Sequence, residues 1–398
     1  MKSAALIALL AAAGAFAAAP YQLTSTELTA LAAHAPAALQ ATLKTVVDKP
    51  APPPVGDLHD YVSYARYYWP DPAKPDGLPY VSRDGQHNRE QVARGDRGRI
   101  GDFGEIVPRL AAAWSVNRDE AAARRAGEWL RAWFLTPATR MNPHLDYAQV
   151  RLGHNHNLGS PAGVLDARGF ADVIDAIRLL HGSPAFAAGE EDALRAWFAA
   201  YLGWLTTARN AQNEHGAANN HGSWFLAQAI PIARFAGRDD LAREWCEGDK
   251  ARLAAQIRPD GSQPEEIRRV DGLGYSAFNL EAQFHVVRLA AGLDIDLWNY
   301  TAPNGASLRP TAPACASRWT SCAPTTRRRK NGPPRRTKSC GPASSTRCCN
   351  RPSCFRPGRR QSRRAPGARP GGKDFEGLRL RGLVAQRPPR GESRRPCS

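Results

Sequence analysis

Cysteine is nearly absent from the first 308 residues of this 398-residue chain. Cys246 is the one cysteine there, and the other seven lie further along the chain. A single cysteine cannot form a disulfide within this part, so a disulfide-stapled fold is excluded. After the N-terminus, the sequence also has no apolar run of about 20 residues, the length that a membrane-spanning helix needs.

The N-terminus has the pattern of an export signal. Lys2 precedes the apolar run AALIALLAAAGAF, and the small residues Ala15 and Ala17 suit a cleavage site. The run is too short to span a bilayer comfortably. We therefore expect residues 1–17 to direct the protein to the periplasm, with no membrane contact after cleavage; a retained anchor is the alternative.

The last 90 residues, 309–398, have few acidic and few apolar side chains. They hold 24 of the 54 Lys and Arg but three of the 37 Asp and Glu, so the formal charge of +17 comes from this segment. Three Leu, one Val and no Ile cannot bury enough apolar area to offset the entropy lost on ordering. The composition predicts a disordered basic tail.

Two interpretations of this tail remain open. Clustered arginines attract phosphate, as in RNA-binding segments, but Trp319 and two Phe are all that the tail offers for stacking on bases. Its cysteines lack a paired zinc spacing. Enrichment in Arg, Pro, Ala, Gly, Ser and Cys is also typical of a GC-rich gene read out of frame. We favour a frameshift and expect no nucleic-acid partner.

Residues 18–308 have the patterning of an all-α domain. From 104 to 295, apolar residues recur at spacings of three and four, as in amphipathic helices, and Gly or Pro marks most helix ends. Short links between helices of similar length predict antiparallel pairs, which can curve into an incomplete (α/α) toroid. Another helix is expected over 23–48, with a capping box from Thr24 to Glu27, and a long ordered loop over 61–88.

Two polar clusters could carry chemistry. Asn219, Asn220 and His221 precede a helix, where Asn220 either caps the helix or offers an amide to a cleft beside the imidazole. Arg268 and Arg269 precede Tyr275, and an arginine beside a tyrosine lowers the pKa of the phenol. The alternative is a tyrosine packed at a helix start, with solvated arginines.

A third cluster is the histidine-rich stretch 141–163. His154 and His156 could bind zinc only with further ligands, and carboxylates are sparse nearby. We therefore expect no metal and favour a polar loop that meets sugar hydroxyls.

Amide, imidazole, guanidinium and phenol groups suit proton abstraction beside a carboxylate. Removing the C5 proton of a uronate builds negative charge on its C6 carboxylate, which such donors stabilise. A base takes the proton and an acid protonates the leaving O4, giving β-elimination. A glycoside hydrolase would instead need two paired carboxylates, and a noncatalytic acidic-polysaccharide-binding protein is also possible. The candidate carboxylates for the hydrolase are Asp166, Asp260, Glu265 and Glu266.

Several blocks between Tyr61 and Tyr300 resemble the bacterial alginate lyase family. They are YYWPDPAKPDGLPYVSRDGQHN, EWLRAWFLTPATRMNPHLDYAQ, ARNAQNEHGAANNHGSWF, ARLAAQIRPDGSQPEEIRR, YSAFNLEAQ and DLWNY. The resemblance implies an incomplete (α/α) toroid with a long groove, acting on alginate or a related polyuronate in the periplasm without a cofactor. We expect a monomer. The stretches VDGLGYS and RLGHNHNLGSPAG depart from the family pattern, which puts substrate preference in doubt.

The resemblance also assigns site residues. The Asn–His pair falls on Asn220 and His221, and the tyrosine of the Tyr-Ser block on Tyr275. The functional arginine falls on Arg268, with Arg269 as the alternative. Tyr275 is then the general acid, and also the base for a C5 proton on its side, while His221 is the base for the opposite epimer or a charge neutraliser. Substrate-binding candidates are Arg83, Gln86, Asn88, His144, Tyr147, Trp224 and Arg269.

Overall fold

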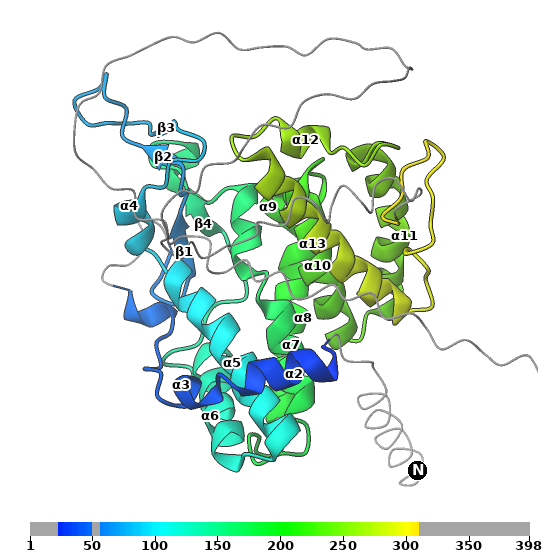
Figure 1. The fold of residues 1–398 in the computed structure, drawn as a ribbon. Coiled ribbons are helices and arrows are strands. Elements are labelled where there is room, and N and C mark those ends of the chain that lie inside the picture. The colour runs from blue at the N-terminus through cyan, green and yellow to red at the C-terminus, as the bar shows by residue number, and fades with distance from the viewer. Residues whose placement is uncertain (1–22, 50–55, 310–398) are drawn as a thin grey trace, which may run out of the picture. The chain divides into compact units, whose positions relative to one another are not determined.

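The computed structural model describes residues 23–49 and 56–309 (Figure 1). The expected signal peptide and nearly all of the expected basic tail lie outside these residues. All described residues belong to the first of two units into which the chain divides, Met1–Ala316.

Helices dominate the described residues, which confirms the all-α class predicted from the apolar periodicity. The α-helices are α2 Ser25–Ala32, α3 Ala35–Leu39, α4 Arg89–Ala93, α5 Arg97–Asn117, α6 Glu120–Leu130, α7 Phe170–Leu179, α8 Glu190–Thr207, α9 Arg209–His215, α10 Asn220–Phe235, α11 Asp239–Gln256, α12 Pro264–Ile267 and α13 Gly272–Ala291. Shorter helical turns are η1 Val46–Asp48, η2 Arg131–Leu135, η3 Asn155–Asn157 and η4 Pro161–Ala167. No helix in the described ranges has both the length and the apolar character to cross a membrane.

The central helix α10 anchors the site. It is buried on almost every face and packs against α7, α8, α9, α11 and α13. Short connections make α5 with α6, and α10 with α11, into antiparallel hairpins, as expected for paired helices. Because Asn220 and His221 open α10, the rigid core fixes their position.

Two local predictions need correction. The region 23–48 breaks into α2, α3 and η1 because Pro36 starts a new helix, although the Thr24–Glu27 capping box is present. The expected loop over 61–88 contains the strands β1 Val62–Tyr64, β2 Tyr68–Trp69 and β3 Val81–Ser82. Strand β1 pairs in parallel with β4 Tyr147–Val150, and β2 pairs antiparallel with β3.

The strand region lies at the same end of the fold as α12 and the start of α13. Figure 1 shows β2 and β3 at the same end as α12, and hydrogen bonds join the two regions directly. Segments nearly 200 residues apart in sequence therefore build the site together.

Candidate active site

Tyr275 lies in the first turn of α13 between two side chains from different parts of the chain. Its phenol oxygen is 2.8 Å from that of Tyr67, which comes from the strand region. The guanidinium carbon of Arg269 lies 3.8 Å from the centre of the Tyr275 ring. Arg269 in turn donates two hydrogen bonds to the Asp84 carboxylate, at 3.0 and 2.7 Å. Asp84 therefore holds the guanidinium against the phenol.

The phenol of Tyr275 is a weaker acid than a free tyrosine. Burial raises its pKa, and the hydrogen bond and charge of Tyr67 raise it further, outweighing the lowering by Arg269. The net direction is opposite to the one expected from the arginine alone, because burial and the hydrogen bond with Tyr67 outweigh the charge of Arg269. Tyr275 is thus protonated at neutral pH.

Asn220 is tied to the buried carboxylate of Glu266 on α12. Its backbone N–H donates to Oε1 at 2.6 Å and its Nδ2 to Oε2 at 2.7 Å. Asn219, and not Asn220, is the N-cap of α10, since its side chain accepts from the His221 N–H. Both functional groups of Asn220 therefore hold Glu266 beside the start of α10.

His221 pairs with a carboxylate from the preceding helix. Its Nδ1 lies 2.6 Å from Oε1 of Glu214 on α9. Glu214 is almost fully buried, and burial raises its pKa while the His221 contact lowers it. With Nδ1–H donated to this carboxylate, Nε2 carries the free lone pair of the neutral ring.

The two halves of the site converge on Glu266. Burial raises the pKa of its carboxyl group, while the hydrogen bonds from Asn220 and the charges of Arg269 and His221 lower it. A buried amide network lies beneath. Gln256 bonds the Asn219 carbonyl, Asn279 bonds both Gln256 and Gln263, and Gln263 bonds the Ser276 carbonyl next to Tyr275.

Comparison with known proteins identifies the family of the chain. The alginate lyase family model matches residues 45–315, about two thirds of the chain. A crystal structure of an alginate lyase from Bacteroides ovatus is 39% identical, with a TM-score of 0.68, over 71% of this chain and 74% of that one. The chain belongs to the alginate lyase family. It is therefore a polysaccharide lyase.

Other comparisons add little to this. Alginate lyase A1-III from Sphingomonas species A1 is 18% identical, with a TM-score of 0.45, over 71% of this chain and 73% of that one. No curated protein matches the sequence.

The two candidate arginines of this alginate lyase family member have different settings. The side chain of Arg268 is 67% exposed and forms an ion pair with Glu265. Arg269 is 22% exposed and lies on the Tyr275 ring. The structure thus brings together Asn220, His221, Arg269 and Tyr275, and places Arg268 at the surface.

Three of the substrate-binding candidates, Arg83, Gln86 and Asn88, lie in the segment that contains Asp84. Asn88 is nearly buried, caps α4 and donates to the Tyr68 carbonyl at 3.0 Å, so its side chain is used in the fold. Arg83 lies over the Trp69 ring, and the Gln86 carbonyl accepts from the Trp69 indole. The side chains of Arg83 and Gln86 are solvent-accessible beside Asp84.

Among the described residues, His144, Tyr147 and Trp224 contact groups outside this cluster. Nε2 of His144 lies 2.9 Å from the Asp60 carboxylate, and Tyr147 is its ring neighbour. Trp224 is 6% exposed and packs on Phe278, so it contributes to the core.

The structure also bears on the metal-site and hydrolase alternatives. Nε2 of His154 lies 2.7 Å from the Tyr80 carbonyl oxygen, and no three potential ligands gather at a metal site within the described ranges. Of the carboxylates considered for a hydrolase, Asp166 is buried and bonded to Tyr61 and Ser63, and Glu266 is bound to Asn220. Neither is free to face a glycosidic bond with a second carboxylate.

Four site residues went unrecognised in the sequence. Tyr67 and Asp84 lie far from Tyr275 along the chain, and only the fold brings them to it. Glu214 lies seven residues before His221, and helix α9 with a turn places it there. Glu266 was considered only as a hydrolase carboxylate. The pairing of a histidine with an upstream acid was the one signal that could have suggested Glu214.

Proposed function

We propose that the protein cleaves alginate or a related polyuronate by β-elimination, after export to the periplasm. The observation that carries this proposal is the meeting of a protonated phenol, Tyr275, with a fixed guanidinium, Arg269, beside the His221–Glu214 pair. These groups supply an acid, a cation and a base. Each is held by a partner from another element, so the site is ordered before substrate arrives.

Tyr275 is the general acid. Burial and Tyr67 keep its phenol protonated at neutral pH, so a proton is available for O4 of the leaving sugar. Tyr67 can accept or donate at the same oxygen, so a proton taken up from solvent can pass through Tyr67 to Tyr275 after each turnover, while His221 releases the C5 proton to solvent. A positioned acid of this kind contributes about 10²–10⁴-fold to the rate.

His221 is the base for a C5 proton on its side of the ring. The carboxylate of Glu214 fixes Nδ1–H, leaves Nε2 to take the proton, and stabilises the imidazolium that forms. Because the Tyr275 phenol is protonated, the imidazole is better prepared as a base. For the epimer whose C5 proton faces Tyr275, the phenol can act as base only after it has released its own proton, which its raised pKa opposes.

The charge that develops on the C6 carboxylate is met by Arg269 and Asn220. Arg269 replaces Arg268 in this role because its guanidinium lies at the phenol. The Nδ2 of Asn220 donates one hydrogen to Glu266 and has a second to offer. Fixed donors in a site shielded from water stabilise such charge strongly.

The test is the ultraviolet absorbance of the unsaturated uronate product. Wild-type protein should generate it from mannuronate- or guluronate-rich alginate, and Tyr275→Phe should reduce kcat by about 10²-fold or more while still binding polymer. Absence of unsaturated product from folded protein on every polyuronate would refute the proposal. Saturated products would indicate a hydrolase, and binding without turnover would indicate a polysaccharide-binding protein.

A further inference from the structure

A basic pocket lies next to the active site, at the start of α5. Its cavity is about 430 Å³, within the range of roughly 300–1,000 Å³ typical of small-ligand sites. Asp102 is the one acidic residue that lines it. The cationic and imidazole side chains of its lining are Lys44, Arg66, His87, Arg89, Arg97 and Arg99.

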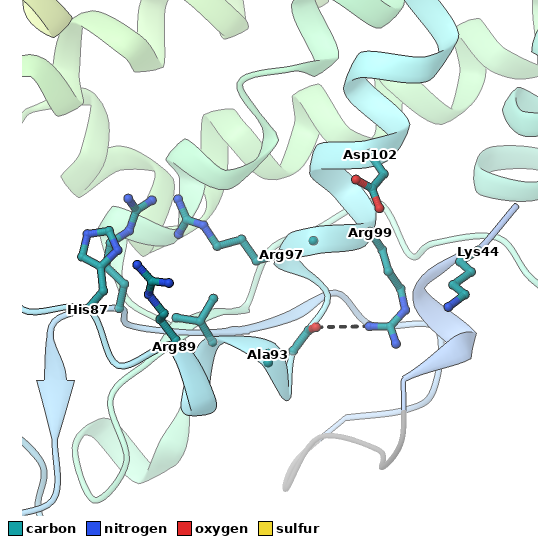
Figure 2. Close-up of a pocket in the computed structure, with 11 residues that line it drawn as sticks. Lys44, His87, Arg89, Ala93, Arg97, Arg99 and Asp102 are labelled. Carbon is teal, nitrogen blue, oxygen red and sulfur yellow. Dashed lines mark hydrogen bonds between the residues drawn. The ribbon is translucent and has the colours of Figure 1, made fainter. Parts of the chain in front are cut away.

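The cations approach the pocket from two sides. Figure 2 shows the His87 ring gathered with the guanidinium groups of Arg89 and Arg97, while Arg99 and Lys44 lie across from them. Burial lowers the pKa of His87, and the charge of Arg89 lowers it further. Such a concentration of positive charge attracts an anion.

Two of these arginines are held in place by buried carboxylates. Arg97 lies 2.9 Å from the buried Asp166 carboxylate, and Arg99 lies 3.2 Å from the buried Asp96 and also donates to the Asp48 carbonyl. A guanidinium that is already fixed loses little freedom when it binds a carboxylate, and its remaining N–H groups form a planar fork. The pocket is therefore built before a ligand enters.

Tyr67 connects the lining of this pocket to the active site. The His87 ring lies 5.2 Å from the Tyr67 ring, and Arg66 is the adjacent residue. The Tyr67 hydroxyl in turn touches that of Tyr275. A polymer whose cleaved bond lies at Tyr275 can therefore place further sugars on the His87 side.

We propose that this basic pocket binds the carboxylates of uronate units that extend beyond the cleaved bond of the same chain. The inference rests on the proposed function for its ligand. Its consequence is a preference for long chains: a polymer reaches both Tyr275 and the pocket, whereas a trisaccharide occupies the catalytic cluster alone.

The experiment compares the wild type with Lys44→Gln/Arg89→Gln, two exposed positions on either side of the pocket. The KM for polymer should rise about fivefold relative to the KM for a trisaccharide, because two partly solvated charge contacts are lost. Arg124→Gln is the matched control: Arg124 is exposed, pairs with Glu120 on α6 and should leave this ratio unchanged. An unchanged ratio in the double variant, or an equal loss on both substrates, would overturn the proposal.

A binding experiment tests the pocket independently of the lyase reaction. In a Tyr275→Phe background, calorimetry with a hexauronate should show a Kd weakened about fivefold by the double variant, and a neutral oligosaccharide of equal length should not bind the pocket. An unchanged Kd, or equal binding of the neutral sugar, overturns the pocket whether or not the wild type forms unsaturated product. Arg66→Gln is a second variant should the double variant fold poorly.

Discussion

Arg268 and Arg269 are neighbours in sequence with opposite surroundings. Arg269 is fixed by two hydrogen bonds to Asp84 and lies on the Tyr275 ring, while Arg268 is largely solvated. A guanidinium held near the reacting carboxylate contributes more to the transition state than a mobile one.

We predict that Arg269→Ala lowers kcat by about 10²-fold or more, and that Arg268→Ala changes it by less than about threefold. Initial rates of unsaturated product on alginate measure both, and circular dichroism confirms folding. An inactive Arg268→Ala enzyme beside an active Arg269→Ala enzyme would reverse the assignment.

Glu214 acts through His221. Its carboxylate holds Nδ1–H at 2.6 Å, and this contact orients the ring. We predict that Glu214→Ala lowers kcat about 10–100-fold with little change in KM, because the imidazole loses its fixed tautomer.

Glu214→Asp, which keeps the charge, should recover part of the rate. A KM increase with unchanged kcat would instead assign Glu214 to substrate binding. The activity of each variant is measured on the mannuronate- and guluronate-rich polymers separately, since the proposed mechanism assigns His221 to one epimer.

At the scale of elements, the site depends on how α10, α11, α12 and α13 meet. Gln256 at the end of α11 accepts from Ser223 and Asn279 and donates to the Asn219 carbonyl, so one side chain joins three elements. Its side chain is buried, so without it each of these partners would lose one hydrogen bond.

We predict that Gln256→Leu lowers the free energy of unfolding by about 1–3 kcal/mol and also lowers kcat, since Asn219 precedes the Asn–His pair. Denaturant unfolding and initial rates measure the two effects. Gln40→Leu, at the exposed end of α3, is the control, expected to change stability by about 0.5 kcal/mol or less. Loss of stability with full kcat would show that the network supports the fold alone.

At the scale of the whole molecule, the His144–Asp60 pair makes stability depend on pH. Burial alone would lower the pKa of His144, but the hydrogen bond and charge of Asp60 outweigh it and raise the pKa. The pKa of Asp60 falls to about 2, since its bonds from His144 and Asn142 outweigh burial. The His144 contribution is complete below its ordinary pKa and lost as pH rises through the raised value; the Asp60 contribution is lost as pH falls toward 2.

We predict that His144→Gln lowers Tm most between about pH 5 and 6 and least above pH 8. Thermal unfolding of both proteins across pH 5–9 measures the difference. The more exposed His181→Gln serves as the comparison. A constant Tm difference across this range would contradict the linkage.

The sequence determined the helical class because each helix must present an apolar stripe to a core, and that stripe has a period that can be counted along the chain. It also located Asn220, His221 and Tyr275, since their blocks are local and distinctive. Strand β4 was missed because its partner β1 is over 80 residues away, so its pairing is not a local signal.

The tertiary structure decided how these groups work. Tyr67 and Asp84 reach Tyr275 and Arg269 only where distant segments meet, and Glu266 reaches Asn220 in the same way. Arg269 lies on the Tyr275 ring while Arg268 is largely exposed, a difference that adjacency in sequence does not reveal. The pKa of Tyr275 depends on burial and on neighbours that adjacency in sequence cannot supply. Order along the chain fixes which groups are available, but distances and solvent exclusion between remote segments fix their chemistry.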